Sequence, residues 1–122
     1  MINEYKRIYG QVRNLTPNEL RETFAAIPMI QLAILFGSRA QDRAPAGAAS
    51  DYDFAVLLDK SMPADWGHLA EARAELGQAL RLADCDFDLV DLEVAPQAIK
   101  KSIKQRYILI KGTENELCRL LG

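Results

Sequence analysis

Three aspartates lie in sequence that is otherwise typical of strands. Asp51 and Asp53 begin a segment of alternating polarity, and Asp88 interrupts the apolar residues Phe87, Leu89 and Val90. Aspartate is depleted in strands, and two ionised carboxylates at positions i and i+2 share a face and repel each other. Carboxylate oxygens are the ligands that Mg²⁺ prefers, and a bound cation offsets this repulsion. We therefore expect Asp51, Asp53 and Asp88 to form a metal-binding group.

Alternatives remain open for these carboxylates. Asp51 can instead cap the strand, and Asp53 can be a solvated residue at its edge. Asp86 shares a face with Asp88 by alternation and can replace it as the third carboxylate. Asp91 should point to the other face unless a bulge shifts the register.

A second candidate site follows the apolar segment 30–36, where the chain reads Gly37-Ser38-Arg39. Glycine lets the backbone approach a ligand closely, and free amides at the start of a helical turn bind anions. Ser38 adds a hydroxyl and an amide. Arg39 can pair with a phosphate or remain a solvated side chain. We expect a phosphate-binding turn at this position.

The elements that must position these residues follow from periodicity and capping. Thr16-Pro17-Asn18-Glu19 is a capping box with proline at the first helical position. Apolar residues at three- and four-residue steps predict helices, and period-two patterns predict strands. We expect helices over residues 16–27, 65–82 and 96–112, strands over 30–36, 51–59 and 85–92, and a loop over 41–50. This order indicates an α/β or α+β fold, with a small mixed sheet and helices packed on one side.

The expected last helix is rich in basic residues: Lys100, Lys101, Lys104, Arg106 and Lys111. Its basic face can contact phosphates or an acidic partner, or it can be a solvated helix face.

Composition limits the class of protein. The 122 residues fit one domain spanning 1–122, with 49% hydrophobic and 26% charged residues. A net charge of -2 gives no overall positive field that would attract nucleic acid. The longest uncharged stretch, 23–38, is too short to span a membrane. The N-terminus does not read as a signal peptide. Cys85 and Cys118 form no metal-type pair, which suggests reduced thiols in a cytoplasmic protein.

Segments 35–40, 50–56 and 87–92 together resemble the nucleotidyltransferase superfamily that includes DNA polymerase β. Within it they look like the minimal nucleotidyltransferase (MNT) branch, whose members act as antitoxins to HEPN-domain toxins. The resemblance covers about residues 32–112. One departure is the segment 39–50, which is two residues longer than the family's usual spacer; extra residues in a loop cost little.

The resemblance implies a nucleotidyltransferase fold and a mechanism. Asp51, Asp53 and Asp88 would be catalytic and bind two Mg²⁺ ions carrying ATP, while Gly37, Ser38 and Arg39 would hold its phosphates. Asp88 would also help to remove the acceptor's proton. The family's reaction transfers AMP to a tyrosine of a HEPN ribonuclease toxin and neutralises it, and we expect the acceptor to arrive on that partner. Two alternatives are an antitoxin that acts by binding alone and a nucleotidyltransferase for small molecules such as antibiotics.

Overall fold

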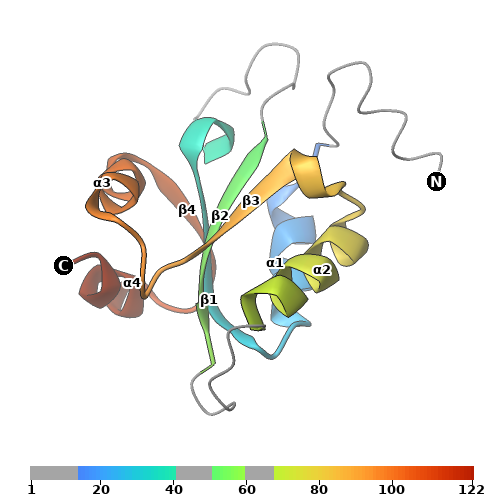
Figure 1. Cartoon of the computed structure of the whole chain (residues 1–122), viewed down its shortest axis with the longest axis horizontal. Coiled ribbons are helices and arrows are strands. Elements are labelled where there is room, and N and C mark those ends of the chain that lie inside the picture. The colour runs from blue at the N-terminus through green and yellow to red at the C-terminus, as the bar shows by residue number, and fades with distance from the viewer. Residues whose placement is uncertain (1–13, 41–50, 60–67) are drawn as a thin grey trace.

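The computed structural model describes residues 14–40, 51–59 and 68–122. This part of the chain contains four helices and four strands, with short 3₁₀ turns before β3 and after β1 (Figure 1). In chain order the elements are α1 (Pro17–Ala25), β1 (Ile30–Phe36), η2 (Gly37–Ala40), β2 (Tyr52–Leu58), α2 (His68–Leu80), η4 (Asp84–Asp86), β3 (Phe87–Asp91), α3 (Gln97–Gln105), β4 (Tyr107–Lys111) and α4 (Glu114–Leu121).

The four strands form one mixed sheet in the order β3-β2-β1-β4. β1 pairs antiparallel with both β2 and β4, whereas β2 and β3 run parallel. The expected mixed sheet is therefore confirmed. The sheet brings the end of β1 and the starts of β2, β3 and β4 to one edge of the molecule.

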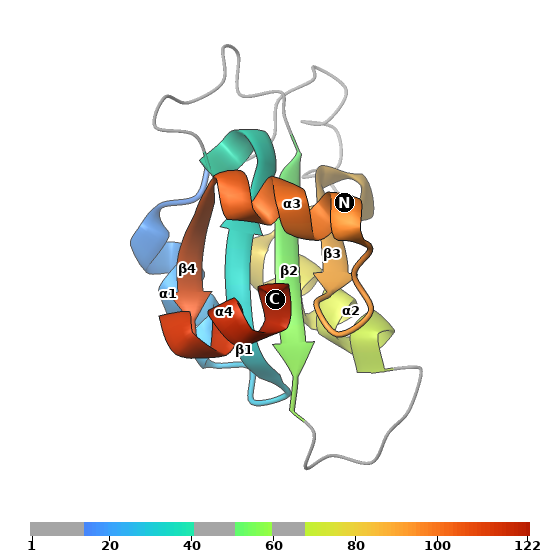
Figure 2. The same ribbon diagram turned by 90° about the vertical axis from the view of Figure 1, so that its left-hand side faces the viewer.

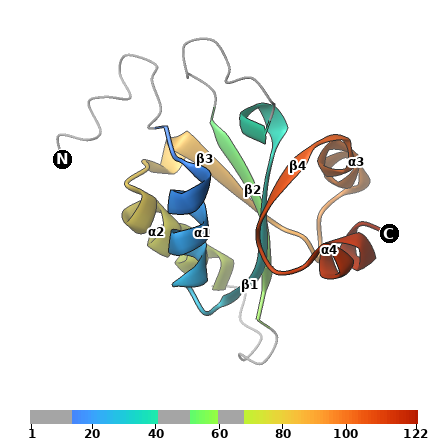
Figure 3. The ribbon, with the colours of Figure 1, turned by 180° about the vertical axis from the view of Figure 1, so that it is seen from behind.

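Helices cover both faces of this sheet, which corrects the expectation of helices on one side. Figure 1 and the reverse view in Figure 3 show α1 and α2 on one face and α3 and α4 on the other, and Figure 2 shows α3 and α4 lying across the strands. Two separate apolar clusters result. In β1, Ala33 and Leu35 belong to the α1/α2 cluster, while Ile34 and Phe36 belong to the α3/α4 cluster. A strand that is apolar on both faces requires two helical layers.

The expected helix over residues 96–112 was wrong in its second half. α3 ends at Gln105, and Tyr107–Lys111 form β4, an edge strand paired with β1. Aromatic and β-branched residues favour strands, and the run Tyr107 to Ile110 supplies a partner for the otherwise unpaired edge of β1. The helical spacing of the isoleucines did not reveal that strand pairing with β1 competes with helix formation in this segment.

The other predicted elements are confirmed with shifted ends. The capping box at Thr16 and Glu19 is present and begins α1. β1 and β2 lie where expected, whereas the segment predicted as a strand from residue 85 begins as a 3₁₀ turn, and β3 starts at Phe87. The predicted loop 41–50 and the predicted first turn of the second helix, 65–67, lie outside the described residues. Within the described ranges, no helix is both long and apolar enough for a membrane span.

Candidate functional site

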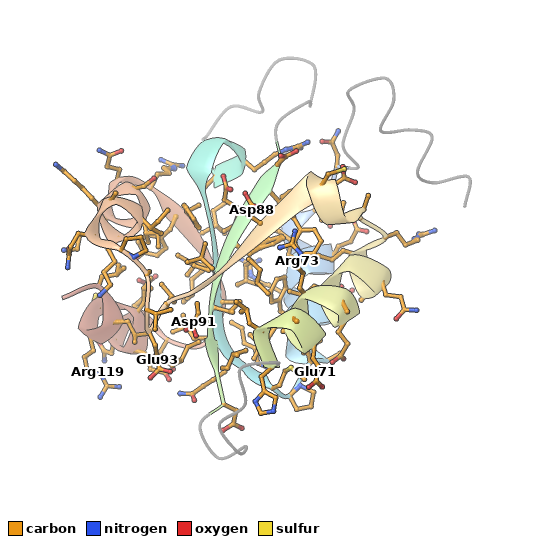
Figure 4. All side chains as sticks on the ribbon, viewed as in Figure 1. Glu71, Arg73, Asp88, Asp91, Glu93 and Arg119 are labelled. Atoms are coloured by element: carbon orange, nitrogen blue, oxygen red, sulfur yellow. The ribbon has the colours of Figure 1, made fainter. Side chains whose placement is uncertain are left out.

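Asp53 and Asp88 are directly opposite each other in the parallel pairing of β2 with β3. The neighbours of each residue fix the face on which it lies. Tyr52, Phe54 and Phe87 belong to the α1/α2 cluster, so Asp53 and Asp88 face the α3/α4 side. Figure 4 shows Asp88 near the edge where the η2 turn lies. Two of the three predicted carboxylates are thus brought together.

Asp51 completes the acidic group just before β2. Asp51 and Asp53 share a face through strand alternation, and both are half-buried. The pKa of Asp53 is raised, first because burial removes water from its carboxylate, and then because Asp88 and Asp51 place negative charge near it. Asp51 and Asp88 therefore both act electrostatically on Asp53.

The Gly37 backbone stands against the carboxylate of Asp53. Phe36 pairs with Asp53 across β1 and β2, and Gly37 follows at once with a φ of +75°. A Cβ atom on Gly37 would overlap the carboxylate oxygen Asp53 Oδ2. Glycine is required both by the left-handed backbone and by this close approach. The predicted Gly-Ser turn and the predicted acids therefore form one site.

The two other residues of the turn are placed differently. Ser38 lies within η2, and its backbone is part of the 3₁₀ turn that follows β1. Arg39 extends its guanidinium over the ring of Tyr52, 4.5 Å from the ring centroid, and donates to Asn14 Oδ1 at 2.7 Å. These contacts lie on the Tyr52 side of β2, whereas Asp53 points to the other face.

Asp86 and Asp91 have local structural roles. Asp86 is buried and its Oδ2 accepts a hydrogen bond from the backbone N–H of Ala83 at 2.9 Å, which closes the η4 turn. Asp91 Oδ1 accepts from the backbone N–H of Glu93 at the end of β3. Asp91 is paired with Val56 and lies further along β3 than Asp88 (Figure 4). Among Asp86, Asp88 and Asp91, only Asp88 is paired with Asp53 in the sheet.

Sequence reasoning missed a role for Arg106 at this edge. Its Nε donates to the carbonyl oxygen of Ala40, the last residue of η2, at 2.9 Å. We had placed Arg106 on a basic helix face, and the structure places it between α3 and β4. No local pattern signals such a contact, because the two residues are 66 positions apart.

The donor set fits a hard divalent cation. Asp51 and Asp88 place negative charge near Asp53, and the three carboxylates offer only oxygen ligands, which suits Mg²⁺. Among residues 14–40, 51–59 and 68–122, no three acidic, histidine or cysteine side chains are already gathered into a metal-binding group. The fit therefore rests on the chemistry of the donors and on the charge that Asp51 and Asp88 impose on Asp53.

Comparison with known proteins gives a consistent result. Residues 18–116 match the family model described as "Polymerase beta, Nucleotidyltransferase". The fold is similar to a crystal structure of a mutant MntA–HpeT toxin–antitoxin, with 27% identity, a TM-score of 0.64, and coverage of 88% of this chain and 82% of that chain. A toxin–antitoxin structure with AMP-PNP is 29% identical, with a TM-score of 0.60 and the same coverage.

A further structure shows likeness of fold alone. It is the tri-AMPylated Shewanella oneidensis HEPN toxin in complex with MNT antitoxin, with 24% identity, a TM-score of 0.60, and coverage of 87% of this chain and 81% of that chain. The comparison with curated proteins gave no match. The resemblance inferred from the sequence motifs is confirmed by the family model and by these structures.

Proposed function

The chain belongs to the polymerase beta nucleotidyltransferase family, and from this premise we propose that it transfers AMP from ATP to a tyrosine hydroxyl of a HEPN-domain toxin and thereby acts as the antitoxin. The observation that carries the proposal is the pairing of Asp53 with Asp88 beside the Gly37 turn. The similarity to toxin–antitoxin structures, one of them with AMP-PNP, supports both the partner and the nucleotide.

Residues from two sides of the site divide the work. Asp51, Asp53 and Asp88 would hold two Mg²⁺ ions, which when bound neutralise phosphate charge and lower the pKa of an attacking hydroxyl. Gly37, Ser38 and Arg39 bind the phosphates of ATP through the backbone amides of the η2 turn, where the absence of a side chain on Gly37 allows close approach; the Arg39 guanidinium itself lies over Tyr52 on the other face. The turn lies against Asp53, so the turn and the acids would orient one nucleotide together.

The reaction is a direct displacement at phosphorus. The tyrosine oxygen forms a bond to the α-phosphorus of ATP, and the bond from that phosphorus to the bridging oxygen of pyrophosphate breaks. The tyrosine proton leaves toward Asp88, whose exposed carboxylate on β3 is accessible to an acceptor arriving from outside. No covalent intermediate with the chain is needed.

The remaining parts of the proposal concern the setting. Residues 1–122 act as one nucleotidyltransferase domain in the cytoplasm, and the acceptor is supplied by the toxin. Direct binding of nucleic acid or membrane is not part of this function; the net charge of -2 is in keeping with that.

The test is the intact mass of the HEPN partner encoded beside the gene, after incubation with the purified chain, Mg²⁺ and ATP. We expect increments of one or more AMP groups with the wild type and none with Asp53→Asn. Asp91→Asn is the matched control, because it makes the same change on β3 away from the acidic pair, and it should transfer AMP normally.

Three results would contradict the proposal. Equal increments with Asp53→Asn would exclude the acidic group from the reaction. A stable complex without any increment would favour an antitoxin that neutralises its toxin by binding alone. Transfer of AMP to the hydroxyl of a small molecule instead of the toxin would favour a small-molecule nucleotidyltransferase.

A further inference from the structure

Arg106 holds the end of the η2 turn from the side opposite the acids. Its Nε donates to Ala40 O at 2.9 Å, and the Ala40 side chain is fully buried. The last carbonyls of a helical turn have no partner within the turn itself. A guanidinium suits this position, because a cation is favourable near the carboxyl end of a helical segment and its hydrogen bond is charge-assisted.

The order of the strands places η2 between two sets of residues. Tyr107 pairs with Phe36, so Arg106 lies beside the point where β1 passes into the turn. On the other side of β1, Asp53 pairs with the same Phe36. The turn therefore starts at Gly37 against the Asp53 carboxylate and ends at Ala40 on the Arg106 guanidinium.

The turn begins against Asp53, so a shift of the turn changes the geometry of the site. Gly37 has a left-handed backbone and no space for even one added carbon beside Asp53. A binding site for phosphate through backbone amides depends on the position of those amides, and small displacements weaken it. A contact that fixes the far end of the turn therefore fixes the amides that would bind phosphate.

We propose that Arg106 is a positioning residue that fixes η2 against Asp53 and so sets the affinity of the site for the triphosphate. The second part rests on the proposed function. Arg106 acts through the turn, and Lys at this position keeps one charged donor but loses the planar fork of the guanidinium.

The experiment compares Arg106→Gln and Arg106→Lys with the wild-type chain. Hydrogen–deuterium exchange of a peptide spanning residues 36–40 reports the turn without any nucleotide. Binding of ATP with Mg²⁺, measured by titration calorimetry, reports the affinity. Arg119→Gln is the matched control: it removes the same charge from an exposed position on α4, away from the turn (Figure 4).

We expect Arg106→Gln to speed exchange in the turn and to weaken ATP binding about tenfold, roughly the effect of losing one good interaction. Arg106→Lys should give exchange rates and ATP affinities between those of the wild type and Arg106→Gln. Arg119→Gln should match the wild type in both measurements. If Arg106→Gln does not fold, Arg106→Lys decides by the same two measurements.

Unchanged exchange in the turn overturns the proposal, and so does faster exchange with unchanged ATP affinity. If the wild-type chain binds no ATP, the proposed function fails, and the role in affinity falls with it. The exchange of the turn then tests separately whether Arg106 fixes η2.

Discussion

Gly37 lies so close to the Asp53 side chain that one carbon added to the glycine would overlap the carboxylate oxygen. The glycine directly follows β1, the aspartate lies near the start of β2, and the antiparallel pairing of these strands brings them together. The proposed phosphate-binding turn and the acidic group are therefore linked by the register of the sheet. A side chain added at Gly37 must therefore displace the Asp53 carboxylate.

Gly37→Ala tests this link. The methyl group must displace the Asp53 carboxylate, and the alanine must adopt a φ near +75°. We expect transfer activity to be lost and the free energy of unfolding to fall by about 1–3 kcal/mol. Urea unfolding and the AMP-transfer assay measure the two effects.

Gly112→Ala is the control that separates strain from the site. Gly112 also has a positive φ, +93°, and an added Cβ would lie 3.0 Å from Leu32 Cγ, away from the acids. We expect a comparable loss of stability with transfer activity retained in the folded protein. Loss of activity in both variants, or in neither, would show that Gly37 has no special place in the site.

Replacing Asp53 by Asn should stabilise the fold while abolishing transfer. Asp53 and Asp88 are like charges directly opposite each other on paired strands, an arrangement that costs about 0.2–1 kcal/mol. The free energy of unfolding of Asp53→Asn should rise by an amount in this range at neutral pH. Asp91→Asn should leave it unchanged within error, because an asparagine can still accept the Glu93 hydrogen bond. A destabilised Asp53→Asn variant would contradict the repulsion.

The stabilisation by Asp53→Asn should depend on pH. The pKa of Asp53 lies above its ordinary value of 3.8, so between 3.8 and the raised pKa the folded state binds more protons than the unfolded chain. The contribution of Asp53 to the free energy of unfolding therefore falls as the pH rises through this interval, and the penalty is complete above the raised pKa.

It follows that the wild type and Asp53→Asn should differ most at neutral pH and converge as the pH falls toward 3.8. Unfolding midpoints in urea at several pH values measure the difference. If the difference in stability between the wild type and Asp53→Asn stays constant or widens on acidification, the charge of Asp53 is not its cause.

Much of the fold could be predicted from short-range signals. The capping box fixed the start of α1, and unbroken or alternating apolar residues indicated β1 and β2. β4 was missed because Ile103, Tyr107 and Ile110 also fit a helical stripe, and only the unpaired edge of β1 decides against the helix. The second helical layer was missed for the same reason: it depends on which faces the strands bury once paired.

The site was predicted where residue type alone was unusual. Aspartates in strands and a glycine after a strand gave Asp53, Asp88 and Gly37, and the sheet brings these three together. The contacts of Arg39 with Tyr52 and of Arg106 with Ala40 were not predictable. Both depend on where a long side chain ends in the folded molecule, and no spacing in the sequence encodes that.

Lys111 offers a test of how the edge strand stabilises the fold apart from the chemistry. Its Nζ donates to the carbonyl oxygens of Phe24 at 3.2 Å and Ile27 at 3.1 Å, at the carboxyl end of α1. Each of these carbonyls also accepts a backbone N–H, Phe24 O from Ile27 and Ile27 O from Ile30, and a cation at this end interacts favourably with the helix dipole. Lys111→Met keeps the length of the side chain but removes both hydrogen bonds.

We expect Lys111→Met to lower the free energy of unfolding by about 1–2 kcal/mol, because hydrogen bonds from a charged donor are among the stronger ones. Lys101→Met removes the same charge from an exposed position on α3 and should change stability by less than about 0.5 kcal/mol. Urea unfolding of both variants gives the comparison. Equal effects would mean that the charge alone matters, whereas loss of AMP transfer in folded Lys111→Met would show that α1 and β4 also support the site.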